Sequence, residues 1–200
     1  MMFKRYSNQP ARSDSRLNSS FFSNSFAYEQ RKGSFSNSYL DESNAIILFL
    51  SKRGTLRAPF ACETLRKIIV DTQFKGRLGL FSRGVTMVYD QCPVDRRINN
   101  YSSLTGTIIE GQSKFAQPED LEKSDFIISL DQESMDFAKL HRKRGYLYPF
   151  TFFRPSGING FIADPYEENN DLDLHYREII SSIEFGCKRI VLSLLSTLSF

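Results

Sequence analysis

Short hydrophobic runs recur along residues 44–200 and alternate with amphipathic stretches. The run Ala45–Leu50 is apolar and rich in branched side chains, as expected for a strand that is buried on both faces. Three more short runs predict further strands, at Leu78–Phe81, Phe126–Leu130 and Tyr146–Phe150. Because strands that alternate with helices form parallel sheets covered on both sides, the pattern predicts an α/β domain with a four-stranded, Rossmann-like parallel sheet.

Helical patterns fill the stretches between these runs. Pro59 is expected to open the first helix, because proline is favoured in a first helical turn. The remaining stretches predict a helical turn at Pro118–Glu122, a helix over Gln132–Leu140 and a long last helix over Leu172–Leu195. The apolar positions of the last helix fall largely on one face, which is the face expected to pack on the sheet.

Residues 1–43 differ in composition from the domain that follows, residues 44–200, and we interpret them as a low-complexity tail. Residues 1–40 hold ten serines and four asparagines, and they show no hydrophobic periodicity. Six basic and two acidic residues give this stretch a net charge of +4, whereas the whole chain carries +3. The tail is therefore basic and the body nearly neutral, and a segment of this composition cannot bury a core of its own.

Aromatic residues recur through the tail in a repeated pattern. Phe22-Ser-Asn-Ser-Phe26 returns thirteen residues later as Phe35-Ser-Asn-Ser-Tyr39. Aromatic anchors separated by small polar residues suit a segment that becomes ordered on a partner, so Phe22, Phe26, Phe35 and Tyr39 are candidate partner-binding residues. An organelle transit peptide and a plain disordered tail are two competing interpretations of the same composition.

The cysteines and histidines argue against several kinds of site. Cys62, Cys92 and Cys187 form no CxxC pair and no metal-ligand spacing, which favours a reducing compartment: the cytoplasm or the interior of an organelle such as a mitochondrion, plastid or cilium. His141 and His175 fall in predicted helices among charged neighbours, so both are expected at the surface. We therefore expect no metal site and no cofactor. No apolar run is long enough to span a bilayer.

The segment between Ala45 and Pro59 combines features that favour anion binding. A hydrophobic strand leads into a short loop, Ser51-Lys-Arg-Gly-Thr-Leu-Arg57, and a predicted helix follows. Loop amides and a helix N-terminus both attract anions, and Arg57 can hold an oxyanion through two N–H groups. We expect phosphate or sulfate as the ligand. The candidate anion-binding residues are Lys52, Arg53, Gly54, Thr55 and Arg57.

This loop resembles the phosphate-binding loop of the low-molecular-weight protein tyrosine phosphatases. In that family a cysteine, five residues and an arginine are usually followed by serine and proline, and the spacing is kept here from Ser51 to Arg57 and Pro59. Further stretches resemble the family in the right order, at residues 81–84, 118–131 and 163–166. The resemblance covers roughly residues 44–195 and implies the family's fold, with Asp164 at the position of its general acid.

The departures from the family pattern fall on positions that carry its chemistry. The family's nucleophilic cysteine is Ser51 here, and the serine that helps to activate it is Ala58. A hydroxyl needs an adjacent base to become a nucleophile, whereas the family's loop stabilises a thiolate. The positions of the family's loop glycine and asparagine hold Arg53 and Gly54 here, so the sequence does not predict the backbone conformation of the loop. Together with Arg57 and Asp164, Ser51 is therefore interpreted as a degenerate catalytic position.

The sequence favours a catalytically inactive, phosphatase-like protein that serves as a structural or protein-binding subunit of a larger assembly, with the tail as its tether. Two alternatives keep the loop in use. One is a residual phosphomonoester or phosphotyrosine hydrolase built on Ser51, Arg57 and Asp164, and the other is a reader that binds phosphate or phosphotyrosine without turnover. Nucleic acid is disfavoured as a partner, because the body is nearly neutral and shows no RNA-binding motif.

Overall fold

A four-stranded parallel sheet forms the centre of the computed structural model, which describes residues 45–102, 106–156, 158, 160–166 and 172–197. The strands lie in the order β2-β1-β3-β4. They are β1 (Ala45–Ser51), β2 (Leu78–Gly84), β3 (Phe126–Ser129) and β4 (Tyr146–Pro149). The parallel sheet predicted from the hydrophobic runs is confirmed, with small shifts at the strand ends.

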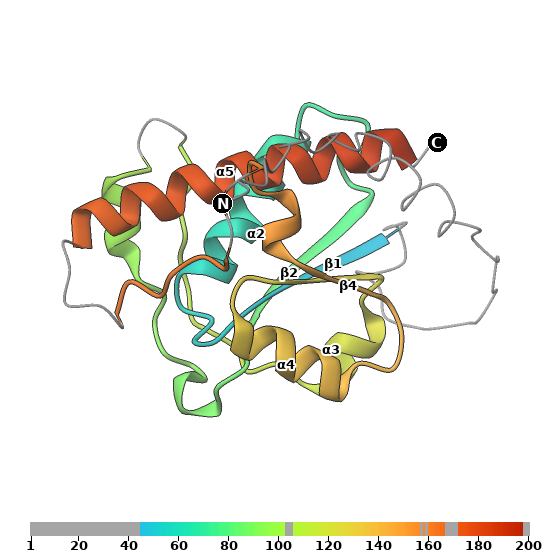
Figure 1. Cartoon of the computed structure of the whole chain (residues 1–200), viewed down its shortest axis with the longest axis horizontal. Coiled ribbons are helices and arrows are strands. Elements are labelled where there is room, and N and C mark those ends of the chain that lie inside the picture. The colour runs from blue at the N-terminus through green and yellow to red at the C-terminus, as the bar shows by residue number, and fades with distance from the viewer. Residues whose placement is uncertain (1–44, 103–105, 157, 159, 167–171, 198–200) are drawn as a thin grey trace, which may run out of the picture.

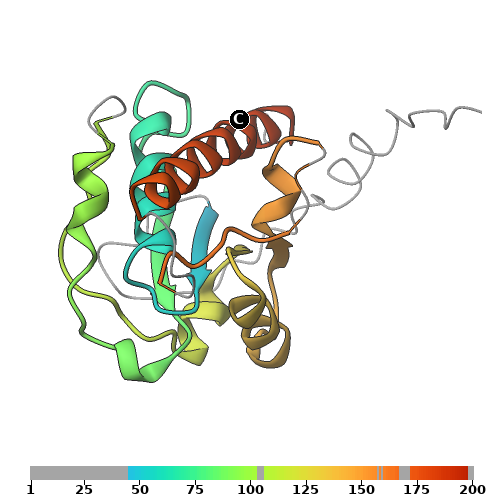
Figure 2. The same ribbon diagram turned by 60° about the vertical axis from the view of Figure 1, so that its left-hand side comes forward.

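Helices cover both faces of this sheet, as Figures 1 and 2 show. One face carries α2 (Arg57–Ile69) and the long α5 (Leu172–Thr197), and the other carries α3 (Pro118–Lys123) and α4 (Gln132–His141). The structure also contains short 3₁₀ helices that the sequence did not predict. These are η1 (Met87–Tyr89), η2 (Arg96–Asn100) and η3 (Phe150–Phe153).

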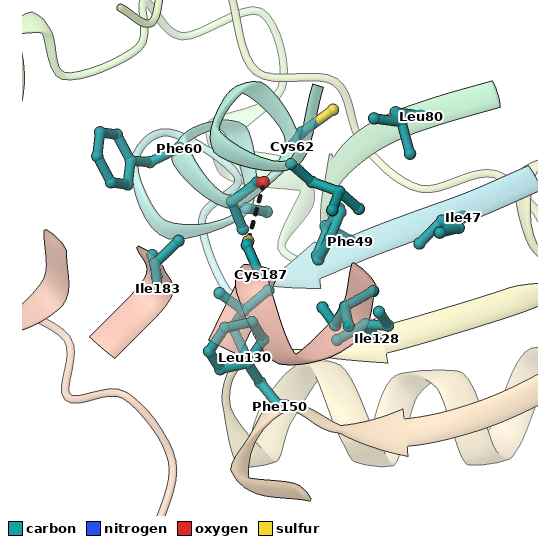
Figure 3. Close-up of a cluster of buried hydrophobic side chains, with 14 of the residues drawn as sticks. Ile47, Phe49, Phe60, Cys62, Leu80, Ile128, Leu130, Phe150, Ile183 and Cys187 are labelled. Carbon is teal, nitrogen blue, oxygen red and sulfur yellow. Dashed lines mark hydrogen bonds between the residues drawn. The ribbon is translucent and has the colours of Figure 1, made fainter. Parts of the chain in front are cut away.

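The alternation of side chains along β1 divides the core into two clusters. Ile47 and Phe49 belong to the cluster under α2 and α5, whereas Leu48 and Leu50 belong to the cluster under α3 and α4. All four side chains are at most 1% exposed, so β1 is buried on both faces, as its unbroken apolar run predicted. Figure 3 shows side chains of the larger cluster gathered between the sheet and the two helices.

Two of the three cysteines belong to this larger cluster (Figure 3). Cys62 in α2 and Cys187 in α5 are both buried, and the Cys187 thiol donates a hydrogen bond to the Ala61 carbonyl at 3.5 Å. Burial raises the pKa of Cys62 to about 12, so the group is a protonated thiol at neutral pH. Cys62 is thus a core residue, and its protonated thiol cannot act as a substitute nucleophile for the missing loop cysteine.

Two predictions about local structure are wrong. Helix α2 begins at Arg57 rather than at Pro59, which is the third helical residue; proline is tolerated there because the N–H groups of a first turn have no partner within the helix. His175 was expected at the surface from its charged neighbours, but this residue is buried. It lies four residues before Ile179 and eight before Ile183, so it shares their core-facing side of α5. His141 is exposed, as expected.

The predicted tail, residues 1–43, lies outside the described residues together with its candidate anchors Phe22, Phe26, Phe35 and Tyr39. Their role in partner binding therefore stays a prediction. Within the described ranges, no helix has the length and hydrophobicity that a membrane span requires. The same ranges contain no group of three or more His, Cys, Asp or Glu side chains that could hold a metal ion.

Candidate anion-binding site

The segment Ser51–Arg57, called the cradle loop from here on, leads from the carboxyl end of β1 into α2. Open parallel sheets place ligand sites at this end of their strands. Gly54 turns the loop with a φ of +69°, a left-handed conformation that residues with side chains rarely adopt. A Cβ atom here would lie 2.5 Å from the Gly84 nitrogen and 2.6 Å from the Ser113 hydroxyl oxygen. The path of the loop, which the sequence left open, therefore depends on glycine at this position.

Ser51 lies at the start of the cradle loop and is only 2% exposed. Its hydroxyl oxygen accepts a hydrogen bond from the Gly54 amide at 3.3 Å, so this loop amide points inward. Among the described residues, no carboxylate or imidazole forms a hydrogen bond with the Ser51 hydroxyl. The described part of the site thus presents Ser51 without a general base.

The guanidinium of Arg57 is buried and is satisfied by the protein itself. Its Nη1 donates a hydrogen bond to the Ile162 carbonyl at 2.6 Å. Its Nη2 lies 2.9 Å from Asp131 Oδ2 and 3.2 Å from Asp164 Oδ2. Arg57 was predicted to bind an oxyanion ligand, but in the structure its guanidinium contacts two buried carboxylates of the protein.

Asp131 joins the cradle loop to α4. It is the N-cap residue of that helix, where its Oδ1 accepts a hydrogen bond from the Ser134 amide at 2.9 Å. Its Oδ2 accepts a second hydrogen bond from the Lys52 amide at 2.7 Å. Asp131 was not among the site residues predicted from the sequence. An aspartate just after a buried strand, with serine three positions later, was the available signal, because this capping pattern falls at the carboxyl edge of the sheet.

Arg53 and Asp164 close the cradle loop. Arg53 Nε lies 3.1 Å from Asp164 Oδ2, and the guanidinium carbon lies 5.1 and 4.8 Å from the ring centroids of Tyr89 and Tyr166. Asp164 Oδ1 also accepts a hydrogen bond from the Tyr166 amide at 3.1 Å. The structure therefore brings Asp164 to the cradle loop, where its carboxylate pairs with Arg53 and Arg57.

Asp95 fixes Tyr166 in this arrangement. The hydroxyls of Tyr166 and Tyr176 both donate to its carboxylate, and Arg97 binds the two carboxylate oxygens at 2.8 Å. The Asp95 amide donates to the Thr55 carbonyl at 2.8 Å, which ties the cluster to the cradle loop. Burial by itself would raise the pKa of Asp95, but the hydrogen bonds outweigh it and hold this pKa well below its usual range. Burial and the bond to Asp95 raise the pKa of both tyrosines.

Little space remains inside the cradle loop. The cavity between the loop, Asp164 and Tyr166 measures about 10 Å³, which is close to the least that a water molecule needs. A larger cleft of about 210 Å³ is lined by Lys52, Arg57 and Asp131, and Lys52 Nζ lies there 3.0 Å from a carboxylate oxygen of Glu133. The candidate anion-binding residues are thus brought together as the spacing implied, but each of their three cationic side chains forms an ion pair within the chain.

Comparison with known proteins identifies a family whose sequence pattern this chain matches. The family model described as low molecular weight phosphotyrosine protein phosphatase matches residues 46–198. No curated protein matches the chain.

Solved structures of low sequence identity share the fold. The protein tyrosine phosphatase of Entamoeba histolytica with Hepes in the active site has a TM-score of 0.69 and 16% identity, covering 76% of this chain and 97% of that chain. YfkJ from Bacillus subtilis has a TM-score of 0.68 and 18% identity, covering 78% and 98%. YwlE arginine phosphatase, also from Bacillus subtilis, was solved as a serine-for-cysteine mutant with a phosphorylated active-site serine. It has a TM-score of 0.57 and 16% identity, covering 75% and 95%.

Proposed function

The chain belongs to the low molecular weight phosphotyrosine protein phosphatase family, and we propose that it is a catalytically inactive member that serves as a protein-binding subunit of a larger assembly. The paired state of Arg57 carries this proposal. Its guanidinium already contacts Asp131 and Asp164, so a phosphoryl group would have to displace a buried carboxylate to reach it. The cavity of about 10 Å³ inside the cradle loop leaves no room for that group without movement of the loop or of Asp164.

The chemistry of Ser51 supports the absence of turnover. A thiolate is a good nucleophile near neutral pH because its pKa can be lowered by loop amides, whereas a hydroxyl needs a base to remove its proton. Ser51 receives the Gly54 amide but contacts no base among the described residues, and the residue after Arg57 is Ala58, which has no hydroxyl.

The binding role rests on the tail. Residues 1–43 repeat the Phe-Ser-Asn-Ser-aromatic pattern and carry most of the excess positive charge, so they suit attachment to an acidic protein surface. Co-purification with the native assembly tests this role. The full chain is expected to co-purify, and a variant with Phe22, Phe26, Phe35 and Tyr39 all replaced by serine is expected to be lost. Equal recovery of the two chains would show that the globular domain, and not the tail, makes the attachment.

An activity assay tests the catalytic half of the proposal. The purified chain, its Ser51→Ala variant and its Ser51→Cys variant are incubated with a reactive aryl phosphate. We expect no turnover by the natural chain above the level of Ser51→Ala. Turnover that disappears in Ser51→Ala would show a working serine enzyme and overturn the proposal. A gain of activity in Ser51→Cys would add that the loop can still open around a phosphoryl group.

One comparison favours a second candidate function, that of a phosphoryl acceptor. The YwlE mutant holds a phosphorylated serine in an active site of the same fold. In this chain the inward Gly54 amide is placed to stabilise an oxygen bound to Ser51. Intact mass after incubation with an aryl phosphate tests the idea. A gain of one phosphoryl group that persists in the natural chain and is absent from Ser51→Ala would establish this function in place of inert binding.

A phosphate reader is the remaining alternative, and it differs from the acceptor in needing Arg57 but not Ser51. Isothermal titration with phosphate distinguishes the two. Measurable binding that is lost in Arg57→Ala and kept in Ser51→Ala would favour a reader. The inactive subunit is expected to bind too weakly for detection in all three proteins.

A further inference from the structure

Four aromatic side chains form a continuous strip on β3, β4 and η3. This aromatic strip consists of Phe126, Tyr146, Tyr148 and Phe152. Phe126 and Tyr146 face each other across the two strands with ring centroids 5.9 Å apart. The next contacts follow at 6.5 Å between Tyr146 and Tyr148 and at 5.8 Å between Tyr148 and Phe152. Each ring therefore touches its neighbour, and the four rings form one connected aromatic row.

The strip runs from the core to the surface: Phe126 is buried in the larger cluster and Tyr148 packs against that cluster, whereas Tyr146 and Phe152 are exposed. Tyr146 is 39% exposed and Phe152 is 42% exposed, although both side chains are large and aromatic. They belong to, or directly follow, β4, which is the last strand in the order β2-β1-β3-β4. A connected apolar surface at the edge of a sheet is typical of a place where another segment binds.

We propose that the aromatic strip binds the second aromatic repeat of this same chain, Phe35–Tyr39. The place where the tail joins the domain supports this occupant. Residues 1–44 precede Ala45, the first residue of β1, and the parallel register sets Ile47 of β1 opposite Phe126 and Phe126 opposite Tyr146. The start of β1 is thus two strand spacings, about 10 Å, from β4. Tyr39 is six residues before Ala45, and six residues reach up to about 20 Å.

The spacing inside the repeat also fits. In an extended segment Phe35 and Tyr39 lie on one face, about 13 Å apart, with the two intervening serines on the other face. Both rings can therefore contact the strip while the serines remain in water. Aromatic rings that pack on aromatic rings gain more than their buried area alone supplies.

Charge complementarity supports the same direction of docking. The three residues 142–144, Arg-Lys-Arg, lie just before β4 and are all exposed. Lys143 pairs with Glu122. Arg142 and Arg144 donate only to backbone carbonyls, so two of the three cations form no ion pair with a carboxylate of the described residues. Asp41 and Glu42 lie between Tyr39 and the start of β1. A tail that turns toward β4 brings these two acidic residues to the basic side chains at the start of that strand.

Docking of the second repeat goes beyond the proposed function, because it needs neither the cradle loop nor a partner. It leaves the first repeat, Phe22–Phe26, as the part of the tail available to another protein. The tail then leaves the domain from a fixed place beside β4, and a loss of docking would not by itself remove the partner interaction of the first repeat.

Disulfide trapping in the full-length chain tests the proposal. Tyr39→Cys and Tyr146→Cys are combined in a Cys92→Ser background, since Cys62 and Cys187 are buried. Mild oxidation is expected to cross-link monomers at a rate that does not depend on protein concentration, several-fold faster than in a control with Arg77→Cys in place of Tyr146→Cys. Arg77 is exposed, and its carbonyl accepts a hydrogen bond from the Ala45 amide at 3.3 Å, so this control cysteine lies at least as near to the start of β1 but on the side of β2. Equal rates for the two pairs would overturn the proposal. Cross-linked dimers that increase with concentration would also overturn it and point to a second copy as the occupant.

Fluorescence gives an independent test that keeps the strip intact. The chain has no tryptophan, so Tyr39→Trp and Tyr6→Trp each introduce a single reporter. Tyr39→Trp is expected to be several-fold less accessible to acrylamide than Tyr6→Trp. The added Phe152→Ser substitution should abolish this protection, and Leu140→Ser, at a residue that is 78% exposed and outside the strip, should not. Equal quenching of the two reporters, or protection that survives Phe152→Ser, would contradict docking on the strip.

Discussion

At the carboxyl end of the sheet, buried charges pair with one another, whereas beside β4 aromatic rings contact one another and stay partly exposed. Arg57 and its two carboxylates are each less than a tenth exposed, while Tyr146 and Phe152 are more than a third exposed. The charged end satisfies its own groups and leaves a cavity of about 10 Å³. At the end where parallel sheets place ligands, the charges are thus paired within the chain, whereas the edge beside β4 presents exposed aromatic rings.

The largest expected effect comes from breaking the charge cluster. Arg57→Met leaves Asp131 and Asp164 buried without their shared cation, so we expect the free energy of unfolding at neutral pH to fall by about 3–5 kcal/mol. Urea titration measures this change. Arg96→Met, at an exposed arginine, is the matched control and should change stability by less than about 0.5 kcal/mol. Similar losses in both variants would show that Arg57 is not a structural cation.

The next effect concerns the backbone beneath the charges. Gly54→Ala adds a Cβ atom that would meet the backbone of Gly84, and it forces alanine into a left-handed conformation. We expect a loss of about 2–4 kcal/mol. Gly76→Ala shares the positive φ but meets no atom within 4 Å, so only the conformational penalty of about 1–2 kcal/mol remains. A difference near zero between the two variants would mean that the loop yields easily.

A pH titration of stability sharpens the account of the Asp95 cluster. The pKa of Asp95 is depressed in the folded state by hydrogen bonds from Arg97, Tyr166 and Tyr176, which outweigh its burial. Such a group stabilises the fold above its unfolded pKa of about 3.9, and this stabilisation is lost as the pH falls toward the folded pKa. Asp95→Asn should cost about 1–2 kcal/mol at neutral pH and should weaken the fall in stability below about pH 4. If the free energy of unfolding fell with pH in parallel for the natural chain and Asp95→Asn, groups other than Asp95 would cause the loss of stability in acid.

A smaller effect is expected when the internal competitor for Arg57 is neutralised. Asp164→Asn removes one of the two carboxylate charges at Arg57 while keeping the shape of the side chain. We expect the affinity for sulfate to rise by about 1 kcal/mol, or roughly fivefold, so that binding too weak to detect in the natural chain gives a measurable signal in isothermal titration. Asp136→Asn, at an exposed residue of α4, should leave sulfate binding unchanged. No gain in Asp164→Asn would indicate that the cradle loop is closed by shape rather than by charge.

The smallest effect on folding is expected at the aromatic strip. Tyr146→Thr replaces one strand-favouring residue by another in an edge strand and loses one partly exposed ring, so the cost should stay below about 1 kcal/mol. Phe150→Thr removes a fully buried ring two positions after Tyr148 and should cost about 3–5 kcal/mol. If the two variants were equally unstable in urea titrations, Tyr146 would belong to the core. The contrast between the carboxyl end of the sheet and the edge beside β4 would then fail.

The sequence predicted what depends on neighbouring positions. The unbroken run Ala45–Leu50 identified the central strand, and the spacing from Ser51 to Arg57 identified the cradle loop, because both patterns lie within a few residues. The partners of Arg57 could not be read in this way. Asp164 lies 107 positions away, and whether it faces a ligand or an arginine depends on how the chain folds back.

Two other site features escaped the sequence for related reasons. Asp95 gains its importance from Tyr166 and Tyr176, which are 71 and 81 positions distant, and nothing in its own neighbourhood signals a cluster of hydroxyls. Asp131 occurred within a stretch that resembles the family, but its local pattern predicts a helix cap. The same carboxylate also accepts a hydrogen bond from the Lys52 amide, and this contact exists only because α4 packs against the cradle loop in the folded chain.

The close approach of Gly54 and Gly84 also constrains how this chain can change by mutation. A Cβ atom on Gly84 would lie 2.6 Å from the Arg53 carbonyl oxygen and 3.1 Å from the Gly54 nitrogen, so each glycine occupies the space that a side chain on the other would need. Replacement of one cannot be compensated by replacement of the other, because both changes fill the same gap. A second substitution therefore cannot rescue the first, and random mutagenesis selected for folding alone should retain both glycines, whereas Gly76, where an added Cβ meets no atom within 4 Å, should vary.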